Sequence, residues 1–308
     1  MRKISLAAVV VSAVLLITAI RAGLPAERTD ASETRITVLD VGQGDAVLVD
    51  GPGDAEILID GGPTPDLARR LSRALGNDRS LDLVVLTHPH ADHVIGLADV
   101  LRRYDVGRIL LTGVIHTTRD YEEFLTTIRD RHIPTTVAVA GQTYDVGPAR
   151  LAILFPFADQ TGVRPENLNS ASIVAMLMVG VGDWKLGVGD ESRRILLTGD
   201  AEADVEALLL DRHCTDRSDS VDPCPRLRAD VLKVPHHGSQ DSSSTAFLVA
   251  VRPHDAIISV GRRNEYHHPH PRALKRLERI GARIWRTDRD GDVAIRVADQ
   301  GLSVSGAR

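Results

Sequence analysis

The stretch that most constrains this chain is residues 86–93, which read Leu-Thr-His-Pro-His-Ala-Asp-His. Three histidines and one aspartate lie within six residues here, directly after an apolar run at 81–86 that is typical of a buried strand. Imidazole and carboxylate groups are ligands that zinc and manganese bind in proteins. A polar turn at a strand end is the simpler interpretation, but it does not account for four ligand-type residues at this spacing. The sequence therefore predicts a metal site where a buried strand ends.

Composition limits the partners of such a site. A chain of 308 residues can bury a full core, as one large domain or as two small ones. The formal net charge of -5 excludes a general basic face for nucleic acid, so any such contact must be local. Aromatic residues make up 3% of the chain, which argues against an extended surface for stacking bases. Metal ions would supply local positive charge on this acidic protein.

The N-terminus indicates export. Residues 1–3 read Met-Arg-Lys, and residues 4–20 are almost wholly apolar, which is typical of an export signal. The apolar run is also long enough to cross a bilayer, and no clear small-residue cleavage site follows it. We expect residues 1–34 to be a signal peptide or, in preference, an uncleaved signal anchor with a linker. The protein would then be exported, and either anchored on the outer face of the membrane or secreted.

The two cysteines, Cys214 and Cys224, lie in a polar segment at 211–225 that has no periodicity. We expect this segment to be a surface insertion. In an exported protein, two cysteines in one loop favour a disulfide that closes it. A metal role for the pair is less favoured because no further ligand set accompanies it.

Strand-like and helix-like segments alternate along residues 35–308, which predicts an α/β fold in one catalytic domain. The expected strands are 35–41, 45–50, 56–60, 81–86, 108–112, 135–140, 150–155, 172–179, 194–197, 230–234, 256–260, 283–287 and 292–298. The expected helices are 66–75, 95–104, 119–131, 202–210, 242–251 and 272–280.

Further polar residues follow the ends of the expected strands. Asp60 precedes two glycines, Asp200 follows Gly199, and the pair His236-His237 follows the strand at 230–234. Eight of the twelve histidines fall in three clusters, at 88–93, 236–237 and 267–270, each after an expected strand. Each aspartate alone could simply cap its own backbone or the next helix. The repeated placement of histidines after strands favours one shared site.

These motifs resemble a known family. The pattern His88-x-His90-x-Asp92-His93, with Asp200 and a later histidine, resembles the metallo-β-lactamase fold superfamily. Segments 39–45, 59–62, 197–200, 233–239 and 268–271 further resemble the hydrolase domain of the ComEC competence family. The resemblance implies an αββα four-layer sandwich with two mixed sheets, outer helices and a dinuclear site between the sheets. ComEC proteins also carry a multi-helix channel, whereas only residues 4–20 of this chain could span a membrane.

The resemblance assigns ligands to two divalent ions, zinc or manganese. His88 and His90 would bind one ion, the group of Asp92, His93 and His237 would bind the other, and Asp200 would bridge them. His236 would face the substrate phosphate, although the roles of His236 and His237 could be exchanged. Related enzymes usually add another histidine between the first cluster and the bridging aspartate. Only His116 and His132 lie in that interval, so the first ion is expected to have fewer protein ligands.

The chemistry implied is attack on phosphorus by a hydroxide between two ions about 3.5–4 Å apart. Asp92, as a metal ligand, is counted as catalytic together with His236 and His268. His236 or His268 would hydrogen-bond the phosphate or protonate the leaving oxygen. Supporting roles, either orienting ligands or contacting substrate, are expected for Asp40, Asp45, Asp60, Asn169, Ser172 and Ser239. For Asn169, Ser172 and Ser239 a capping role is equally compatible with the sequence, as is a turn role for His268.

The resulting functional prediction is a metal-dependent phosphodiesterase or nuclease that contacts the DNA backbone independently of sequence, outside the cytoplasm. One alternative is hydrolysis of another ester or amide at the same site, such as a lactam, a lactone or a phosphorylcholine ester. A second is an inactive metal-binding surface module, and a third is a structural partner of a separate channel protein. The sequence leaves open which metal is bound in the cell and what the oligomeric state is. It also leaves open whether the substrate is DNA or RNA and whether the enzyme is an endonuclease or an exonuclease.

Overall fold

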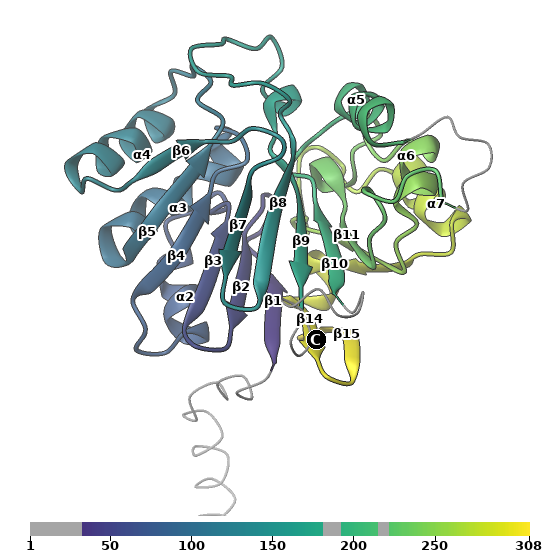
Figure 1. Cartoon of the computed structure of the whole chain (residues 1–308), viewed down its shortest axis with the longest axis horizontal. Helices are drawn as coiled ribbons and strands as arrows, with labels where there is room; N and C mark the ends of the chain where they lie inside the picture. Colours follow the sequence, from purple (N-terminus) through teal and green to yellow (C-terminus); the bar gives the residue numbers. More distant parts are fainter. Residues whose placement is uncertain (1–32, 181–191, 215–221) are drawn as a thin grey trace, which may run out of the picture.

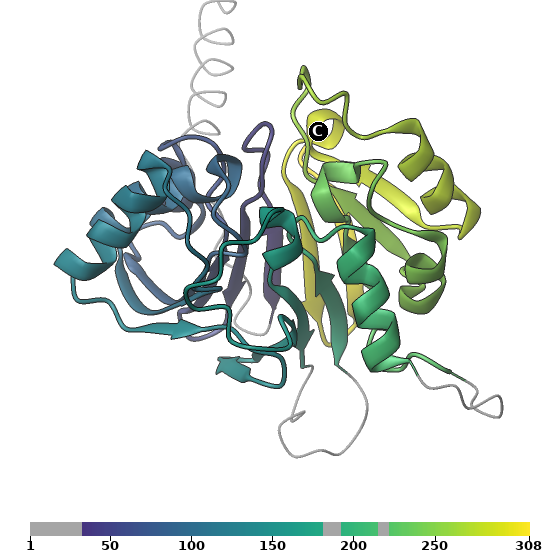
Figure 2. The same ribbon diagram turned by 90° about the horizontal axis from the view of Figure 1, so that it is seen from above.

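Two β-sheets lie face to face at the centre of the molecule, and helices cover the outer face of each (Figure 1). The computed structural model describes residues 33–180, 192–214 and 222–308. In the view from above, the blue helices lie on one side of the sheets and the green and yellow helices lie on the other (Figure 2). The expected αββα four-layer arrangement is confirmed.

Within the described residues, the first sheet has eight strands in the order β15-β14-β1-β2-β3-β4-β5-β6. They are β1 (Thr34–Val38), β2 (Val47–Gly51), β3 (Ala55–Ile59), β4 (Ser80–Val85), β5 (Asp105–Leu111), β6 (Thr135–Val137), β14 (Val293–Ala298) and β15 (Gly301–Gly306). Strands β3 to β6 are parallel. Parallel neighbours need crossover connections, and α2 (Leu67–Ala74), α3 (Ala91–Arg103) and α4 (Arg119–Asp130) supply them.

The second sheet has seven described strands in the order β13-β12-β11-β10-β9-β8-β7. They are β7 (Thr143–Val146), β8 (Ala149–Phe155), β9 (Val174–Val179), β10 (Arg193–Leu197), β11 (Val231–Lys233), β12 (Asp255–Ile258) and β13 (Arg283–Arg286). Strands β10 to β13 are parallel. Helices α5 (Ala203–His213), α6 (Thr245–Val251) and α7 (Pro271–Arg279) connect them, and the short helix α8 (Thr287–Asp290) follows β13.

Three apolar layers hold the four layers of structure together. Alternation along each strand sends side chains to both faces of its sheet: in β3, Ile57 and Ile59 face the space between the sheets, while Leu58 packs under α2 and α3. In the second sheet, Ile195 faces inward and Leu196 packs under the other helices. Strands that are apolar on both faces are expected where sheets are covered on both sides.

Three expectations from the sequence were wrong. Helix α3 begins at Ala91 and not at residue 95, so Asp92 and His93 lie in its first turn. Residues 91–94 lack a clear apolar period, but an acidic residue in the first turn interacts favourably with the helix dipole. Strands β7 and β15 were not expected, because both are edge strands with few apolar residues. Helix α5 extends to His213, into the segment expected to be an insertion.

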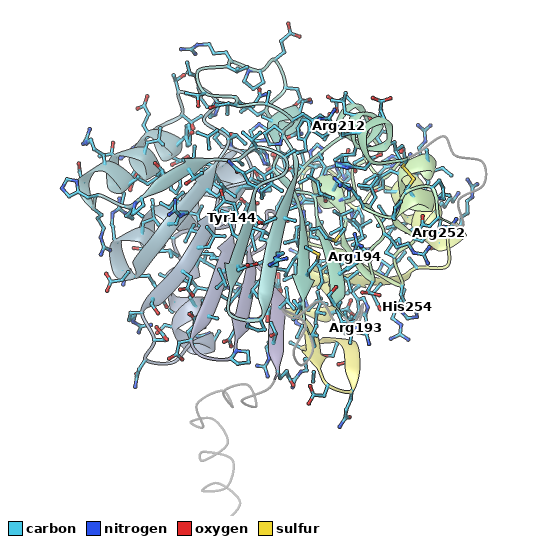
Figure 3. The ribbon with its side chains drawn as sticks, viewed as in Figure 1. Tyr144, Arg193, Arg194, Arg212, Arg252 and His254 are labelled. Atoms are coloured by element: carbon cyan, nitrogen blue, oxygen red, sulfur yellow. A yellow bond between two sulfur atoms is a disulfide. The ribbon has the colours of Figure 1, made fainter. Side chains whose placement is uncertain are left out.

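The expected disulfide between Cys214 and Cys224 is confirmed, and it is drawn as a yellow bond in Figure 3. Residues 215–221 of the expected insertion and residues 1–32 of the expected signal segment lie outside the described residues. Among the helices that the structure does describe, none combines the length and apolar composition needed to cross a bilayer.

The turn after β3 packs backbone to backbone against helix α3. The Gly61 N–H donates to the carbonyl oxygen of His93 at 2.6 Å, and the Gly96 N–H donates to that of Gly62 at 3.2 Å. A Cβ atom on Gly96 would lie 2.0 Å from the Gly61 carbonyl oxygen, so only glycine fits. This contact fixes the distance between Asp60, which precedes the turn, and His93 on the helix.

We therefore expect Gly96→Ala to destabilise the protein by about 1–3 kcal/mol, because the added methyl group forces the turn and helix apart. Helix propensity alone predicts the opposite sign, a gain of about 1 kcal/mol. Equilibrium denaturation with urea measures the difference. A variant as stable as the wild type would show that the two backbones are not in contact.

Candidate metal centre

The candidate residues lie just beyond the carboxyl ends of parallel strands in both sheets. In the first sheet, Asp60 follows β3 and the 88–93 segment follows β4. In the second sheet, Asp200 follows β10 and the pair His236-His237 follows β11. Because the carboxyl ends of parallel strands meet at one edge of a sheet, each sheet contributes half of one site. The order and direction of the strands therefore bring together segments that are far apart in sequence.

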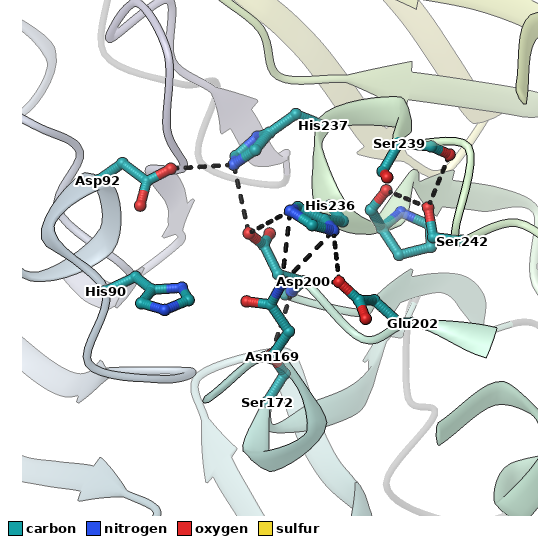
Figure 4. Close-up of polar contacts among 12 residues, drawn as sticks. His90, Asp92, Asn169, Ser172, Asp200, Glu202, His236, His237, Ser239 and Ser242 are labelled. Carbon is teal, nitrogen blue, oxygen red and sulfur yellow. Dashed lines mark hydrogen bonds and ion pairs between the residues drawn. The ribbon is translucent and has the colours of Figure 1, made fainter. Parts of the chain in front are cut away.

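Four ligand-type side chains meet at the centre of the site: Asp92, His93, Asp200 and His237. Figure 4 shows Asp92, Asp200 and His237 of this group. One carboxylate oxygen of Asp200, Oδ2, lies 3.3 Å from His93 Nε2 and 3.4 Å from His237 Nε2. The Asp92 Oδ2 atom lies 3.2 Å from the same His237 nitrogen. All four ligand atoms lie within 4.8 Å of one another. We call these four residues the inner cluster.

The inner cluster fits a divalent cation. His93 Nε2, His237 Nε2 and Asp200 Oδ1 are buried, and none has a hydrogen-bond partner among the described residues. Buried polar atoms are nearly always paired, so three such atoms in one cluster indicate a missing partner. Two imidazole nitrogens with two carboxylate oxygens form a donor set that suits zinc or manganese.

The charges of the inner cluster balance one another. Burial would raise the pKa of Asp200, but the charges of His237 and His93 hold that pKa well below its usual value. Burial would lower the pKa of His93, but Asp200, Asp60 and Asp92 raise it well above its usual value. His237 behaves in the same way, through Asp200 and Asp45. Protonated imidazoles thus take the place of a cation, and binding a metal would release these protons, so metal affinity should rise with pH.

His88 and His90 form a second pair of nitrogens beside the inner cluster. The His88 Nε2 atom lies 3.0 Å from His90 Nδ1 and 3.9 Å from Asp200 Oδ2. Burial and the neighbouring His93 lower the pKa of His88 well below its usual value, so this ring is neutral at pH 7. A neutral imidazole is the form that binds metal. These two nitrogens and Asp200 are the ligands that the resemblance assigns to a second ion, which stays a prediction.

Asp60 and Thr87 orient the histidines of the first sheet. The Asp60 Oδ2 atom lies 2.8 Å from His93 Nδ1 and also accepts a hydrogen bond from the Thr87 hydroxyl at 2.7 Å. The same hydroxyl lies 3.1 Å from His88 Nδ1. A carboxylate on the outer nitrogen of a ligand imidazole fixes its tautomer and leaves Nε2 for the ion. The expected supporting role of Asp60 agrees with this placement.

Asp45 and Lys233 support the histidine of the second sheet. His237 Nδ1 lies 2.9 Å from the carbonyl oxygen of Ser259 and 3.4 Å from Asp45 Oδ1. The other Asp45 oxygen pairs with the buried ammonium group of Lys233. Burial would raise the pKa of Asp45, but Lys233 lowers it to about 2, so the carboxylate stays charged. Sequence reasoning missed Lys233, although a lysine within a buried strand is itself an unusual feature.

The two adjacent histidines of the second sheet point to different partners. His236 and His237 both have positive φ, at 48° and 51°, and Gly238 follows at 79°. Consecutive non-glycine residues in this region are uncommon and gather at functional sites. The turn sends His237 into the inner cluster, while His236 Nδ1 lies 3.0 Å from Glu202 Oε1. His237, and not His236, thus offers a ligand atom to the inner cluster, while the substrate-facing role of His236 stays a prediction.

Glu202 was missed by sequence reasoning. It accepts hydrogen bonds from the side-chain amides of Asn169, at 2.9 Å, and Asn167, at 2.8 Å, in addition to its contact with His236 (Figure 4). The only sequence signal was its position, two residues after Asp200. It was expected merely to begin a helix.

His268 lies at the edge of the site. Its ring centroid is 5.5 Å from that of His236 and 5.8 Å from that of Tyr266, which is 67% exposed. Burial, and then the charges of His236 and His237, lower the pKa of His268 to about 4. The ring is therefore neutral at pH 7. It would serve as a hydrogen-bonding group and not as the acid that protonates a leaving oxygen.

The remaining expected residues are only partly gathered into the site. Ser172 accepts a hydrogen bond from the Asp200 N–H at 3.2 Å, and Ser239 accepts one from the Asp241 N–H at 3.2 Å, which is a local turn contact. Asp40 does not join the site, because its carboxylate pairs with Arg308 at 2.9 Å. The signal for Asp40 was its place in a motif, which does not specify where a side chain points.

Neither His116 nor His132 contacts the side chains of His88 and His90 in a hydrogen bond or ring contact found among the described residues. His132 follows helix α4 and is exposed. His116 lies beside Tyr121, with the two rings tilted and their centroids 6.4 Å apart. Burial is the main cause of the lowered pKa of His90, and His116 contributes a small part. The low number of protein ligands for a first ion therefore stays a prediction.

Comparison with known proteins decides the family. The model of the metallo-beta-lactamase superfamily matches residues 39–262, which contain every residue of the inner cluster. The chain belongs to this superfamily. A crystal structure of a metallo-beta-lactamase fold protein, YhfI from Bacillus subtilis, has the same fold with a TM-score of 0.51 at 15% identity, covering 86% of this chain and 99% of that one.

Curated relatives of this metallo-beta-lactamase domain carry names from competence and recombination. ComE operon protein 3 of Bacillus subtilis is 29% identical over 86% of this chain and 33% of its own length. Recombination protein 2 of Haemophilus influenzae is 29% identical over 89% of this chain and 30% of its own length. The chain thus spans about a third of the length of these relatives. The expected likeness to the competence family is confirmed.

We expect Asp60→Asn to weaken metal binding by about 10–100-fold, because the amide no longer fixes the His93 imidazole as a carboxylate does. Competition with a chromogenic chelator measures the affinity for zinc or manganese. Asp40→Asn is the matched control, since that carboxylate contacts Arg308, and it should leave metal affinity unchanged. Equal losses in both variants would refute the orienting role of Asp60.

Proposed function

We propose that this domain is a metal-dependent phosphodiesterase that cleaves the backbone of DNA. The observation that supports hydrolysis is the meeting of Asp92, His93, Asp200 and His237 in one cluster, in which three buried ligand atoms make no hydrogen bond to the described residues. The choice of DNA is supported by the relatives named for competence and recombination. Both the nuclease activity and the use of two ions are part of this proposal.

In this proposal the inner cluster holds one divalent ion, and His88, His90 and Asp200 hold the other. Bound ions would supply positive charge that acidifies a water and neutralises a phosphoryl group in the transition state. The protein's own residues fix the ligands: Asp60 holds His93, and the Ser259 carbonyl oxygen holds His237. This preorganisation avoids reordering the site during the reaction.

His236 is the residue that we assign to the substrate phosphate. Its Nδ1 atom is held by Glu202, and its Nε2 atom lies 4.0 Å from Asp200 Oδ2, at the border of the inner cluster. A nitrogen next to the ligands can hydrogen-bond a phosphoryl oxygen or donate a proton to the leaving oxygen. His268, a neutral ring beside His236, would add a second hydrogen bond at the same border.

We expect His90→Ala and Asp200→Ala to lose bound metal and to lower diesterase turnover by at least about 100-fold, while the fold is kept. Loss of supercoiled plasmid in the presence of manganese measures activity, and elemental analysis measures metal content. His132→Ala is the matched control, because this exposed histidine follows α4, away from the inner cluster. Full turnover in either site variant would refute the metal assignment.

The same assay separates the proposed function from its alternatives. A lactamase or lactonase would hydrolyse a chromogenic lactam or lactone and leave plasmid intact, and a phosphorylcholine esterase would release choline phosphate. An inactive module would bind metal and turn over none of these substrates. The proposal requires cleavage of phosphodiesters by the wild-type protein.

We also propose that the domain works outside the cytoplasm, anchored through residues 4–20 or secreted, beside a separate channel protein. The support is the basic and apolar N-terminal sequence and the disulfide, which forms in oxidising compartments. We expect an anchored protein to remain with membranes after a wash in 1 M salt, roughly the strength that screens surface charge. Immunoblotting of pellet, wash and medium measures this, and signal in the cytosolic fraction alone would refute export.

A further inference from the structure

Glu56, near the start of β3, is a buried carboxyl group whose pKa is influenced mainly by burial and by acidic neighbours among the described residues. The side chain is 2% exposed, and its Oε2 atom has no hydrogen-bond partner among the described residues. An ionised carboxylate removed from water is costly unless it is paired. Neither the inner cluster nor the proposed reaction makes use of this residue.

The surroundings of Glu56 are acidic. In the ladder between β2 and β3 it stands directly opposite Asp50, and like charges at opposed positions of a sheet are unfavourable. Its own backbone N–H donates to Asp82 Oδ2 on β4 at 3.0 Å. Asp54 lies in the turn between β2 and β3, and Asp78 lies before β4. One carboxylate oxygen from each of Asp54, Glu56 and Asp78 lies within 4.8 Å of the other two. Burial, followed by the charges of these neighbours, raises the pKa of Glu56 to about 8.

We propose that Asp54, Glu56 and Asp78 form a binding site for calcium, separate from the metal centre. The three ligand atoms that these residues offer are all carboxylate oxygens, and hard cations such as calcium prefer oxygen ligands. Oxygens that bind one calcium ion at 2.3–2.6 Å lie at most about 5 Å apart, which agrees with the spacing of these three. The ion would supply the partner that the unpaired oxygen of Glu56 lacks.

The site is independent of the metal centre in both place and chemistry. Glu56 lies at the amino end of β3, whereas Asp60 and the metal centre lie beyond its carboxyl end, about 13 Å further along the strand. The metal centre offers imidazole nitrogens, which suit zinc. The acidic site has no histidine among its ligand atoms, so the two sites should select different ions.

The affinity should be modest. Asp54 is exposed and Asp78 is half-buried, so the ion would keep several water ligands. Calcium sites of extracellular modules have dissociation constants of about 0.1–1 mM, which match calcium levels outside cells better than those inside. Binding of calcium would stabilise the start of β3 and the turn before it.

The test is the thermal unfolding midpoint of the whole chain, with 0.1 mM zinc in every sample, with and without 10 mM calcium. We expect calcium to raise the midpoint of the wild-type protein by about 3 °C, by mass action on the folded state. Glu56→Gln should abolish the shift. Without calcium, Glu56→Gln should melt above the wild type at pH 7, because the folded wild type must protonate a carboxyl group that is ionised in the unfolded chain, and the amide avoids this cost.

The controls locate the ion. Glu278→Gln changes an exposed carboxylate on α7 and should keep the full shift. Asp200→Ala should keep it too, because that residue belongs to the metal centre. Asp54→Asn, in an exposed turn that tolerates substitution, should weaken calcium binding about 5–10-fold. A wild-type midpoint that does not respond to calcium, or a full response in Glu56→Gln and Asp54→Asn, would overturn the proposal and leave Glu56 as a protonated acid.

Discussion

The arrangement of this protein depends on two carboxylates and two imidazoles held close together, three of them buried and Asp92 partly exposed. Asp92 and Asp200 would repel each other there if no positive charge lay between them. In the absence of a metal, the raised pKa values of His93 and His237 supply that charge as protons. Positive charge between the two carboxylates therefore stabilises the inner cluster, and a divalent ion could supply it in place of the protons. The surrounding structure keeps these four groups in place.

Placement of the inner cluster relies on close backbone contacts and not on long side chains. A Cβ atom on Gly44 would lie 2.2 Å from the Asp92 carbonyl oxygen, just as one on Gly96 would meet Gly61. These contacts bring the loops that carry Asp45 and Asp60 against the first turn of α3. The Ser259 hydroxyl then donates to the Gly44 carbonyl oxygen at 2.6 Å, which ties the second sheet to the first. Glycines at these close contacts thus allow residues from both sheets to reach one site.

The parallel strands give the two ends of the first sheet different electrostatic characters. Beyond the carboxyl end of β3, every buried acid is paired with an imidazole or an ammonium group: Asp60 with His93, and Asp45 with Lys233. At the amino end, Glu56 has only acids among the main influences on its pKa. The first end has the donors for a transition metal that can act on substrate. The second has only the oxygens of a structural cation site.

The sequence by itself determined the fold class and most of the inner cluster. Runs of apolar residues predict buried strands, and ligand-type residues directly after those runs predict a metal site. Both patterns can be recognised in the sequence because each involves residues that are close together along the chain. The tertiary structure alone decided which neighbours support the ligands. Asp40 and Asp60 follow strands in similar motifs, but only Asp60 reaches a histidine. Glu202 lay in no motif, and the motif that contains Lys233 did not mark it as a partner of Asp45, since both roles arise from contacts between segments far apart in sequence. The start of α3 and the directions of His236 and His237 likewise depend on backbone dihedral angles that the packed loops impose, and a linear pattern of residue types does not encode such angles.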